Sequence, residues 1–197
     1  MASLVALVIL SPVFVLIVLA IIIEGFLIPK NRGPVFYTET RMSQGKPFTL
    51  RKFRIFKTSA YEPIRRSGAM VHTKKIEHDP ANLTWTGNLL KKFYLDESPQ
   101  LASVLFGDLS MVGTRPWNPA DYQREVEKGI LRKKNIKAGL TGPVQIHKRN
   151  AKAYGGEHKL DSDYGSFCKT HSGFRVVLHD AWLLLQSVAF MLRGQGL

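Results

Sequence analysis

"MASLVALVILSPVFVLIVLAIII", residues Met1–Ile23, is the stretch that decides how this chain is organised, because it contains no charged residue. At about 1.5 Å of rise per residue, a helix of this length reaches across the roughly 30 Å hydrocarbon core of a bilayer. No basic residue precedes the run, and no small-x-small cleavage site follows it before Glu24, so it differs from a cleaved signal peptide. The stretch therefore predicts a helix that stays inserted in a membrane.

Ser11 and Pro12 lie near the middle of this apolar run. Proline removes one helical hydrogen bond and clashes with the preceding turn, while a serine hydroxyl can bond to the freed carbonyl. Two structures fit the pattern: a kinked helix that crosses the membrane once, and a re-entrant hairpin that returns to the same face. Lys30 and Arg32 place the following chain on the cytoplasmic side in either case. These residues alone do not choose between the two structures.

The composition indicates an anionic partner for a chain of 197 residues, a length that fits one domain beyond the apolar segment. The 28 Lys and Arg against 15 Asp and Glu give a formal net charge of +13. Such a surplus suits nucleic acid, an acidic membrane surface or a phosphorylated substrate. The cations are spread along the chain without a recognisable binding motif, so we expect no nucleic-acid partner. The single cysteine, Cys168, excludes an intrachain disulfide and a cysteine-based zinc site.

The rest of the chain predicts a mixed α/β, or α+β, domain. Residues 33–56 alternate apolar and polar side chains on either side of a Ser-Gln-Gly-Lys turn, which is a β-hairpin pattern. Residues 60–81 fit a loop or a surface helix. Residues 83–93 and 99–106 fit two short helices, the first of them basic.

The C-terminal half predicts further short elements. Asn118-Pro119 caps a helix that continues to about Lys128. Residues 137–146 form a glycine-rich loop that leads into a short strand. Residues 176–192 are apolar almost all round, which predicts a helix that lies in the membrane interface or packs on the core.

Between the two short helices, "LDESPQL" (Leu95–Leu101) sets two carboxylates, Asp96 and Glu97, side by side in a basic chain. One interpretation is local: Pro99 suits the first position of a helix, Ser98 caps its amides, and the carboxylates favour its positive end. The other interpretation is catalytic, because the same helix end would also offer N–H groups to phosphate oxygens. The two interpretations are compatible.

Several stretches together resemble one family, the bacterial sugar transferases of the monotopic phosphoglycosyl transferase superfamily. They are the apolar segment with its Ser-Pro, "GPVFYTETRMSQGKPFTLRKFRIF", "LDESPQLASVLFGDLSMVGTRP", "KAGLTGPVQIHKRN", "LDSDY" and "HDAWLLLQSVAFMLRGQG". The resemblance implies a re-entrant membrane helix at residues 1–28, broken at Ser11-Pro12. It also implies a compact, membrane-associated catalytic domain at residues 29–197, with a β-hairpin and interfacial helices, on the cytoplasmic face of the bacterial inner membrane.

The resemblance implies a reaction as well. Members move a sugar 1-phosphate from a UDP-sugar to a polyprenyl phosphate such as undecaprenyl phosphate, release UMP and so initiate glycoconjugate assembly. Asp96 falls on the nucleophile and Glu97 on its catalytic neighbour, and an aspartate can form an acyl phosphate that the lipid phosphate later resolves. A diphosphate facing two carboxylates needs Mg2+, which we expect to bind through phosphate oxygens together with Asp96 and Glu97. The sequence leaves open whether Glu97 binds the metal or orients the acceptor.

The resemblance assigns substrate binding to five further residues, Lys52, Arg54, Lys91, Arg115 and Pro116. Lys91 stands where the family usually has an arginine for the lipid phosphate, and it keeps the charge without the bidentate fork. Arg115 and Pro116 match a nucleotide-binding Pro-Arg-Pro, and Lys52 and Arg54 match a motif near the active site. The alternative is a catalytically silent membrane scaffold that binds nucleotide sugar or lipid. The sequence leaves open which sugar is transferred and whether the protein forms a homo-oligomer.

Overall fold

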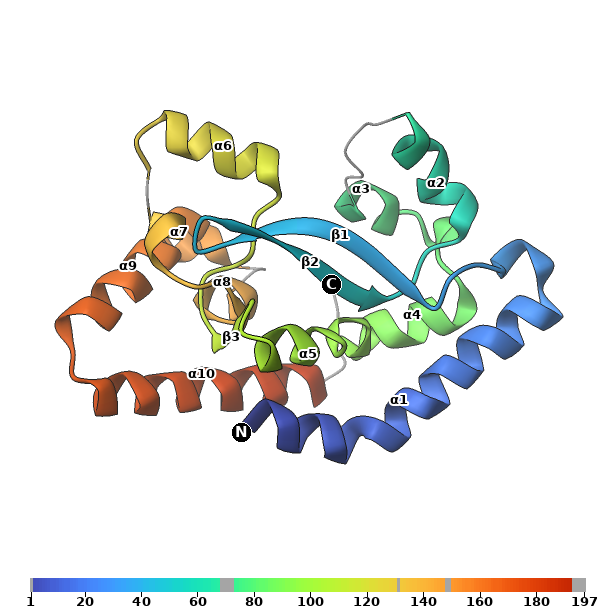
Figure 1. Cartoon of the computed structure of the whole chain (residues 1–197), viewed down its shortest axis with the longest axis horizontal. Coiled ribbons are helices and arrows are strands. Elements are labelled where there is room, and N and C mark those ends of the chain that lie inside the picture. Colours follow the sequence, from blue (N-terminus) through green and yellow to red (C-terminus); the bar gives the residue numbers. More distant parts are fainter. Residues whose placement is uncertain (1, 68–72, 131, 148–149, 193–197) are drawn as a thin grey trace.

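The apolar N-terminal segment folds as one helix, α1 (Ala2–Leu27), in the computed structural model of this chain, which describes residues 2–67, 73–130, 132–147 and 150–192. Pro12 lies inside the helix, and the Ser11 hydroxyl donates a hydrogen bond of 2.7 Å to the carbonyl of Val8. That carbonyl, four residues before the proline, is the one that loses its amide partner. The predicted break is therefore a bend in a continuous helix (Figure 1), because the serine satisfies the freed carbonyl.

A β-hairpin follows α1 and the short 3₁₀ helix η1 (Pro29–Asn31). Strand β1 (Phe36–Ser43) pairs antiparallel with β2 (Lys46–Phe53) along the whole of both strands. Gln44 and Gly45 form the turn with φ angles of 50° and 78°. The hairpin predicted from the alternating sequence is confirmed.

The C-terminal arm of α1 packs against the end of this hairpin. Ile17 and Ile21 of the helix join a buried cluster that includes Phe53, Phe56 and Tyr61. Burial of apolar surface of this kind contributes about 25 cal/mol per Å². The cluster therefore fixes one arm of the membrane helix on the hairpin.

The middle of the chain, as far as residues 58–67 and 73–105 describe it, contains α2 (Thr58–Arg66), α3 (Thr73–Glu77), η2 (Pro80–Asn82), α4 (Trp85–Lys92), η3 (Leu95–Glu97) and α5 (Gln100–Leu105). Helices α4 and α5 confirm the two short helices that the sequence predicted. The polar stretch before them carries α2 and α3. Figure 1 shows α4 and α5 between the hairpin and the two long apolar helices.

The second half of the chain contains β3 (Ser110–Val112), α6 (Pro119–Glu127), α7 (Arg132–Asn135), β4 (Gly139–Thr141), α8 (Pro143–Ile146), η4 (Ala151–Tyr154), α9 (Glu157–Thr170) and α10 (Gly173–Leu192). Strands β3 and β4 pair in parallel as a second small sheet. A Cβ at Gly139 would lie 2.1 Å from the backbone nitrogen of Gly113, so glycine permits this close approach. The predicted glycine-rich loop therefore contains the strand itself, and the segment expected to be a strand is helical.

Exposed apolar side chains gather on α1 and α10, at the start of α4 and at the end of α5. Among them are Ile9, Leu16, Trp85, Phe106, Trp182 and Leu185. Figure 1 shows α1 and α10 along the lower side of the molecule. By length and composition, residues 3–27 and 173–192 are both apolar enough to cross a membrane, with mean hydropathy of 3.2 and 1.3. Exposed apolar side chains on two helices along one side of a domain favour contact of that side with a membrane.

Candidate active site

The carboxylates of Asp96 and Glu97, referred to below as the dyad, lie in a tight turn between α4 and α5. Tyr94 adopts a left-handed conformation with φ of 55°, and η3 then carries both carboxylates. The Ser98 hydroxyl donates to the carbonyl of Leu95 at 2.6 Å, and α5 begins only after Pro99. The prediction that Ser98 caps the helix is therefore wrong. The dyad belongs to a separate 3₁₀ turn, which the left-handed residue sets off from α4.

The Asp96 carboxyl is buried, with 7% of the residue exposed. Burial raises its pKa to about 7; the charge of Lys52 opposes this shift, and the carboxylates of Glu97 and Glu77 add to it. An ionised carboxylate in this position lacks solvation and faces other negative charges. Strongly shifted pKa values of this kind gather at functional sites, which favours the catalytic interpretation of the dyad.

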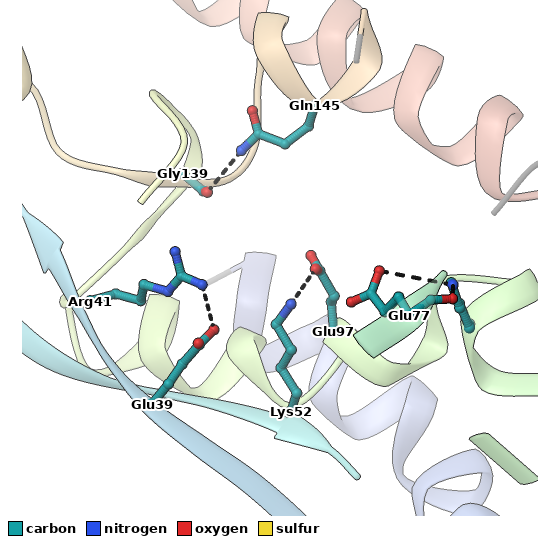
Figure 2. A network of polar contacts seen from close by, with 8 residues as sticks. Glu39, Arg41, Lys52, Glu77, Glu97, Gly139 and Gln145 are labelled. Carbon is teal, nitrogen blue, oxygen red and sulfur yellow. Dashed lines mark hydrogen bonds and ion pairs between the residues drawn. The ribbon is translucent and has the colours of Figure 1, made fainter. Parts of the chain in front are cut away.

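Lys52, on β2, reaches the dyad directly. Its Nζ donates a hydrogen bond of 2.7 Å to Glu97 Oε1 (Figure 2). Burial by itself lowers the pKa of Lys52, but the charges of Glu97, Asp96 and Glu39 outweigh burial and raise it. Lys52 is therefore a firmly charged cation beside two carboxylates, as its assignment to substrate binding requires.

Lys91 lies on the other side of the dyad, in the last turn of α4. Its Nζ donates to the Glu77 carbonyl at 3.1 Å and lies 3.9 Å from the Glu77 carboxylate. The same carboxylate contributes to the raised pKa of Asp96. The structure therefore brings Lys91 and Asp96 to the same neighbourhood, through Glu77.

Arg115 and Pro116 join two cavities. The first, which we call the dyad pocket, is lined by Glu97 of the dyad together with Lys52, Gln100, Arg115, Pro116 and Gln145. Asp96 lines a smaller adjoining cavity, which also contains Lys52 and Glu77. The second, which we call the polar cleft, encloses about 410 Å³ between β1, α6 and α9, and its lining includes Arg41, Arg115, Trp117, Arg124, Lys128 and His158. The cleft also carries the carboxylates of Asp121, Glu125 and Glu157. The two cavities share Arg41, Arg115 and Pro116, so together they suit a phosphorylated substrate that extends beyond the reacting atoms.

Two residues of β1 belong to the site although the sequence did not single them out. Glu39 and Arg41 both line the dyad pocket, and their side chains form an ion pair of 2.9 Å. In the hairpin register, Tyr37 stands opposite Lys52, so Tyr37, Glu39 and Arg41 share the face that carries Lys52. The signal was available: once Lys52 is placed at the site, strand alternation assigns alternate residues of β1 to the same face.

Arg54 is not brought to either cavity. It is 2% exposed and donates to three backbone carbonyls, those of Pro34, Phe56 and Asn31, at 2.6, 2.7 and 2.9 Å. The guanidinium thus ties η1 and the start of the hairpin to the end of β2. The structure gives Arg54 a structural position, in contrast with the substrate-binding role that the sequence predicted.

The dyad is compatible with a partly hydrated divalent cation. Among the described residues, no three His, Cys, Asp or Glu side chains gather closely enough to hold a metal by themselves. Mg2+, however, commonly binds through one or two carboxylates with substrate phosphates and water completing its shell. Two adjacent carboxylates, one buried with a raised pKa, supply this kind of ligand set.

Comparison with known proteins identifies the family. The sequence profile of the bacterial sugar transferases matches residues 1–194. The chain belongs to this family. The profile extends over α1, the dyad turn and both cavities, so the residues described above lie within the part that defines the family.

Three relatives show the range of similarity. The chain is 39% identical over 136 residues to the uncharacterized sugar transferase EpsL of Bacillus subtilis strain 168, covering 68% of this chain and 62% of the relative. It is 34% identical over 144 residues to the UDP-glucose:undecaprenyl-phosphate glucose-1-phosphate transferase of Escherichia coli K12, covering 72% and 28%. It is 30% identical over 179 residues to the exopolysaccharide production protein ExoY of Rhizobium meliloti strain 1021, covering 83% and 73%. The chain therefore spans less than a third of the Escherichia coli protein.

Proposed function

We propose that this protein transfers a sugar 1-phosphate from a UDP-sugar to a polyprenyl phosphate, through a covalent intermediate on Asp96. The observation that carries the proposal is the buried Asp96 beside Glu97 and Lys52, on a domain that exposes apolar helices and next to a cleft that contains several arginines. The Escherichia coli relative is named for this class of reaction with UDP-glucose and undecaprenyl phosphate. These features bring a phosphate-binding site next to a lipid phase.

In the first half of the reaction, an Asp96 oxygen attacks the β-phosphorus of the donor. The bond from this phosphorus to the bridging oxygen breaks, UMP leaves, and the sugar phosphate remains on Asp96 as an acyl phosphate. Attack requires the ionised carboxylate, and Lys52 favours ionisation because it lowers the pKa of Asp96. Arg115, shared by the dyad pocket and the polar cleft, lies where it can bind the departing UMP phosphate.

In the second half, an oxygen of the polyprenyl phosphate attacks the same phosphorus, and the Asp96 carboxylate is restored. Lys91 pairs with Glu77, whose carboxylate adds to the raised pKa of Asp96, and it can hold the phosphate of the acceptor. Bound Mg2+ would neutralise charge on the phosphate oxygens, with Asp96 and Glu97 as its protein ligands. Glu97, held by Lys52, keeps its carboxylate directed into the dyad pocket.

We further propose that α1 is re-entrant and that the domain lies on the cytoplasmic face of the inner membrane. The C-terminal arm of α1 is fixed on the hairpin by Ile17 and Ile21, and α1 also packs against α5. In Figure 1 the bend keeps the N-terminal arm beside the domain, on the side where α10 lies. Both arms therefore follow the apolar side, which suits insertion into one leaflet better than a crossing.

The test is UMP release from a panel of UDP-sugars, with polyprenyl phosphate and Mg2+, by the full chain in nanodiscs. We expect release by the wild type and a loss of at least about 1,000-fold in Asp96→Asn, because the amide is not a nucleophile. Asp163→Asn changes an exposed aspartate of α9 and serves as the matched control with normal activity. Full activity in Asp96→Asn would exclude Asp96 as the nucleophile. A wild-type protein that binds UDP-sugar but releases no UMP would support the alternative of a catalytically silent membrane scaffold.

A further inference from the structure

Arg41 occupies the junction of the two cavities. Its side chain lines both the dyad pocket and the polar cleft. It is 19% exposed and projects from the same face of the hairpin as Lys52 (Figure 2). A molecule that reaches from the dyad into the cleft must pass this guanidinium.

The hydrogen bonding of Arg41 is incomplete within the described part of the chain. Its Nη2 donates to Glu39 Oε1 at 2.9 Å, but its Nε is buried and meets no hydrogen-bond acceptor among the described residues. A buried donor without an acceptor is costly, and each such group calls for an explanation. The guanidinium has five N–H donors in a fixed plane and cannot lose its charge, so it suits phosphate oxygens.

We infer that Arg41 is a binding residue for the diphosphate of the nucleotide-sugar donor. This inference rests on the proposed function and adds a residue that neither the sequence motifs nor the relatives' names assign. Glu39, 14% exposed, holds the guanidinium against the strand, so that the terminal N–H donors not bonded to Glu39 can bond to oxygens of the two phosphates. Lys52 then faces the phosphate next to the dyad, and the nucleoside extends into the polar cleft.

The arrangement separates two contributions to donor binding. Arg41 interacts with the diphosphate, whereas Trp117 and His158, whose ring centroids lie 5.9 Å apart in an edge-to-face contact, line the cleft into which the nucleoside would extend. Loss of Arg41 should therefore weaken the binding of ligands that carry phosphate groups. The affinity of a ligand without phosphate should not change.

The test is calorimetric titration of UDP and of uridine into the full chain in nanodiscs with Mg2+. We expect Arg41→Met to weaken UDP binding about 30-fold, since a hydrogen-bonded charge pair at a buried site has this magnitude, and to change uridine binding less than 2-fold. Arg41→Lys, which keeps the charge and loses the fork, should weaken UDP binding about 5-fold. Arg51→Met, at an exposed arginine on the opposite face of the hairpin and outside both cavities, is the matched control and should stay within 2-fold.

Each outcome decides a separate question. Unchanged UDP binding in Arg41→Met would overturn the inference, and so would an equal loss for UDP and uridine, because that would mean a general structural role. Retained uridine binding shows that the variant is folded. If the predicted binding pattern appears while the wild type releases no UMP from any donor, the inference on Arg41 stands and the proposed transferase activity fails.

Discussion

Two regions of this molecule each bury a carboxylate, and they differ in what compensates the buried charge. Where α1 meets the domain, Glu24 is 8% exposed and accepts hydrogen bonds of 2.6, 2.6 and 2.8 Å from Asn31 Nδ2 and the amides of Trp85 and Thr86. At the dyad, Asp96 is buried to the same degree, but burial raises its pKa to about 7. At similar solvent exposure, one carboxylate is satisfied by three hydrogen bonds, whereas the other is deeply enclosed and has a raised pKa.

The two cations of "KFR" repeat this contrast over three residues. Arg54 directs its donors to backbone carbonyls that are fixed by the fold, whereas Lys52 directs its ammonium to Glu97 at the edge of an open pocket. A charge bonded to the backbone stabilises one geometry. A charge bonded to a partly exposed side chain can exchange its partner for a substrate phosphate. The comparison teaches that the partner of a buried charge, more than its burial, distinguishes structure from function here.

The largest expected effect comes from Arg54. Arg54→Met leaves three buried carbonyls without their donor, which we expect to destabilise the fold by about 3–5 kcal/mol and to lower its melting temperature by about 10 °C. Thermal unfolding in nanodiscs measures this. Arg51→Met, which removes an exposed arginine from the same strand, is the control and should change the melting temperature by no more than about 1 °C. If Arg54→Met and Arg51→Met melted at the same temperature, Arg54 would have no structural role to set against the role of Lys52.

Lys52→Met should show the opposite pattern. We expect about 100-fold slower turnover, because the site loses a cation facing the phosphate and the pKa of Asp96 rises further without Lys52. Stability should fall by less than in Arg54→Met, since the ammonium bonds to one partly exposed carboxylate and not to three buried backbone carbonyls. Steady-state UMP release and thermal unfolding on the same preparation check both parts. A large loss of stability with normal turnover would place Lys52 with Arg54 among the structural residues.

Glu24→Gln should weaken the attachment of α1 to the domain without changing the transferase activity. The amide oxygen can accept fewer of the three hydrogen bonds and has no charge, so we expect a loss of about 1–2 kcal/mol in unfolding free energy. Hydrogen exchange should quicken at the amides of Trp85 and Thr86, at the start of α4. Unchanged exchange at these two amides would show that Glu24 does not hold α1 to α4.

The smallest effect is a shift in pH dependence. Because the pKa of Asp96 is raised to about 7, the nucleophilic carboxylate predominates above that pH, and kcat/KM should rise through about pH 7. Glu77 adds to the raised pKa, so Glu77→Gln should move the midpoint to lower pH by less than about one unit. A midpoint that moves to higher pH would contradict this account of the dyad.

The sequence predicted the features that depend on local pattern. The alternation of residues 33–56 gave the hairpin, Ser11-Pro12 gave the bend and its hydroxyl bond to Val8, and the adjacent carboxylates marked the dyad. These signals lie within a few residues of what they predict. The extent of the break in α1 differed, because Ser11 compensates for the missing amide. Ser98 differed as well, because its hydroxyl bonds to the Leu95 carbonyl and does not cap α5.

The features that sequence reasoning missed depend on partners far along the chain. Arg54 looks like a second active-site cation until the carbonyls of Asn31, Pro34 and Phe56 surround it. Glu77 reaches Asp96 only because α3 folds beside α4, and strands of three residues such as β3 and β4 are too short to show alternation. Arg41 could have been assigned from the strand register, but only after Lys52 had been placed.

The central claim is that Asp96 carries the sugar phosphate between donor and acceptor. The direct measurement is peptide mass spectrometry of the wild-type protein. The protein is first incubated with Mg2+ and a UDP-sugar that it accepts as a donor, without polyprenyl phosphate. We predict a mass increase of one sugar phosphate on the peptide that contains Asp96, absent in Asp96→Asn and lost when polyprenyl phosphate is added. Glycolipid formation at the normal rate, with no labelled peptide at any time during turnover, would contradict the covalent mechanism and indicate direct transfer between the two substrates.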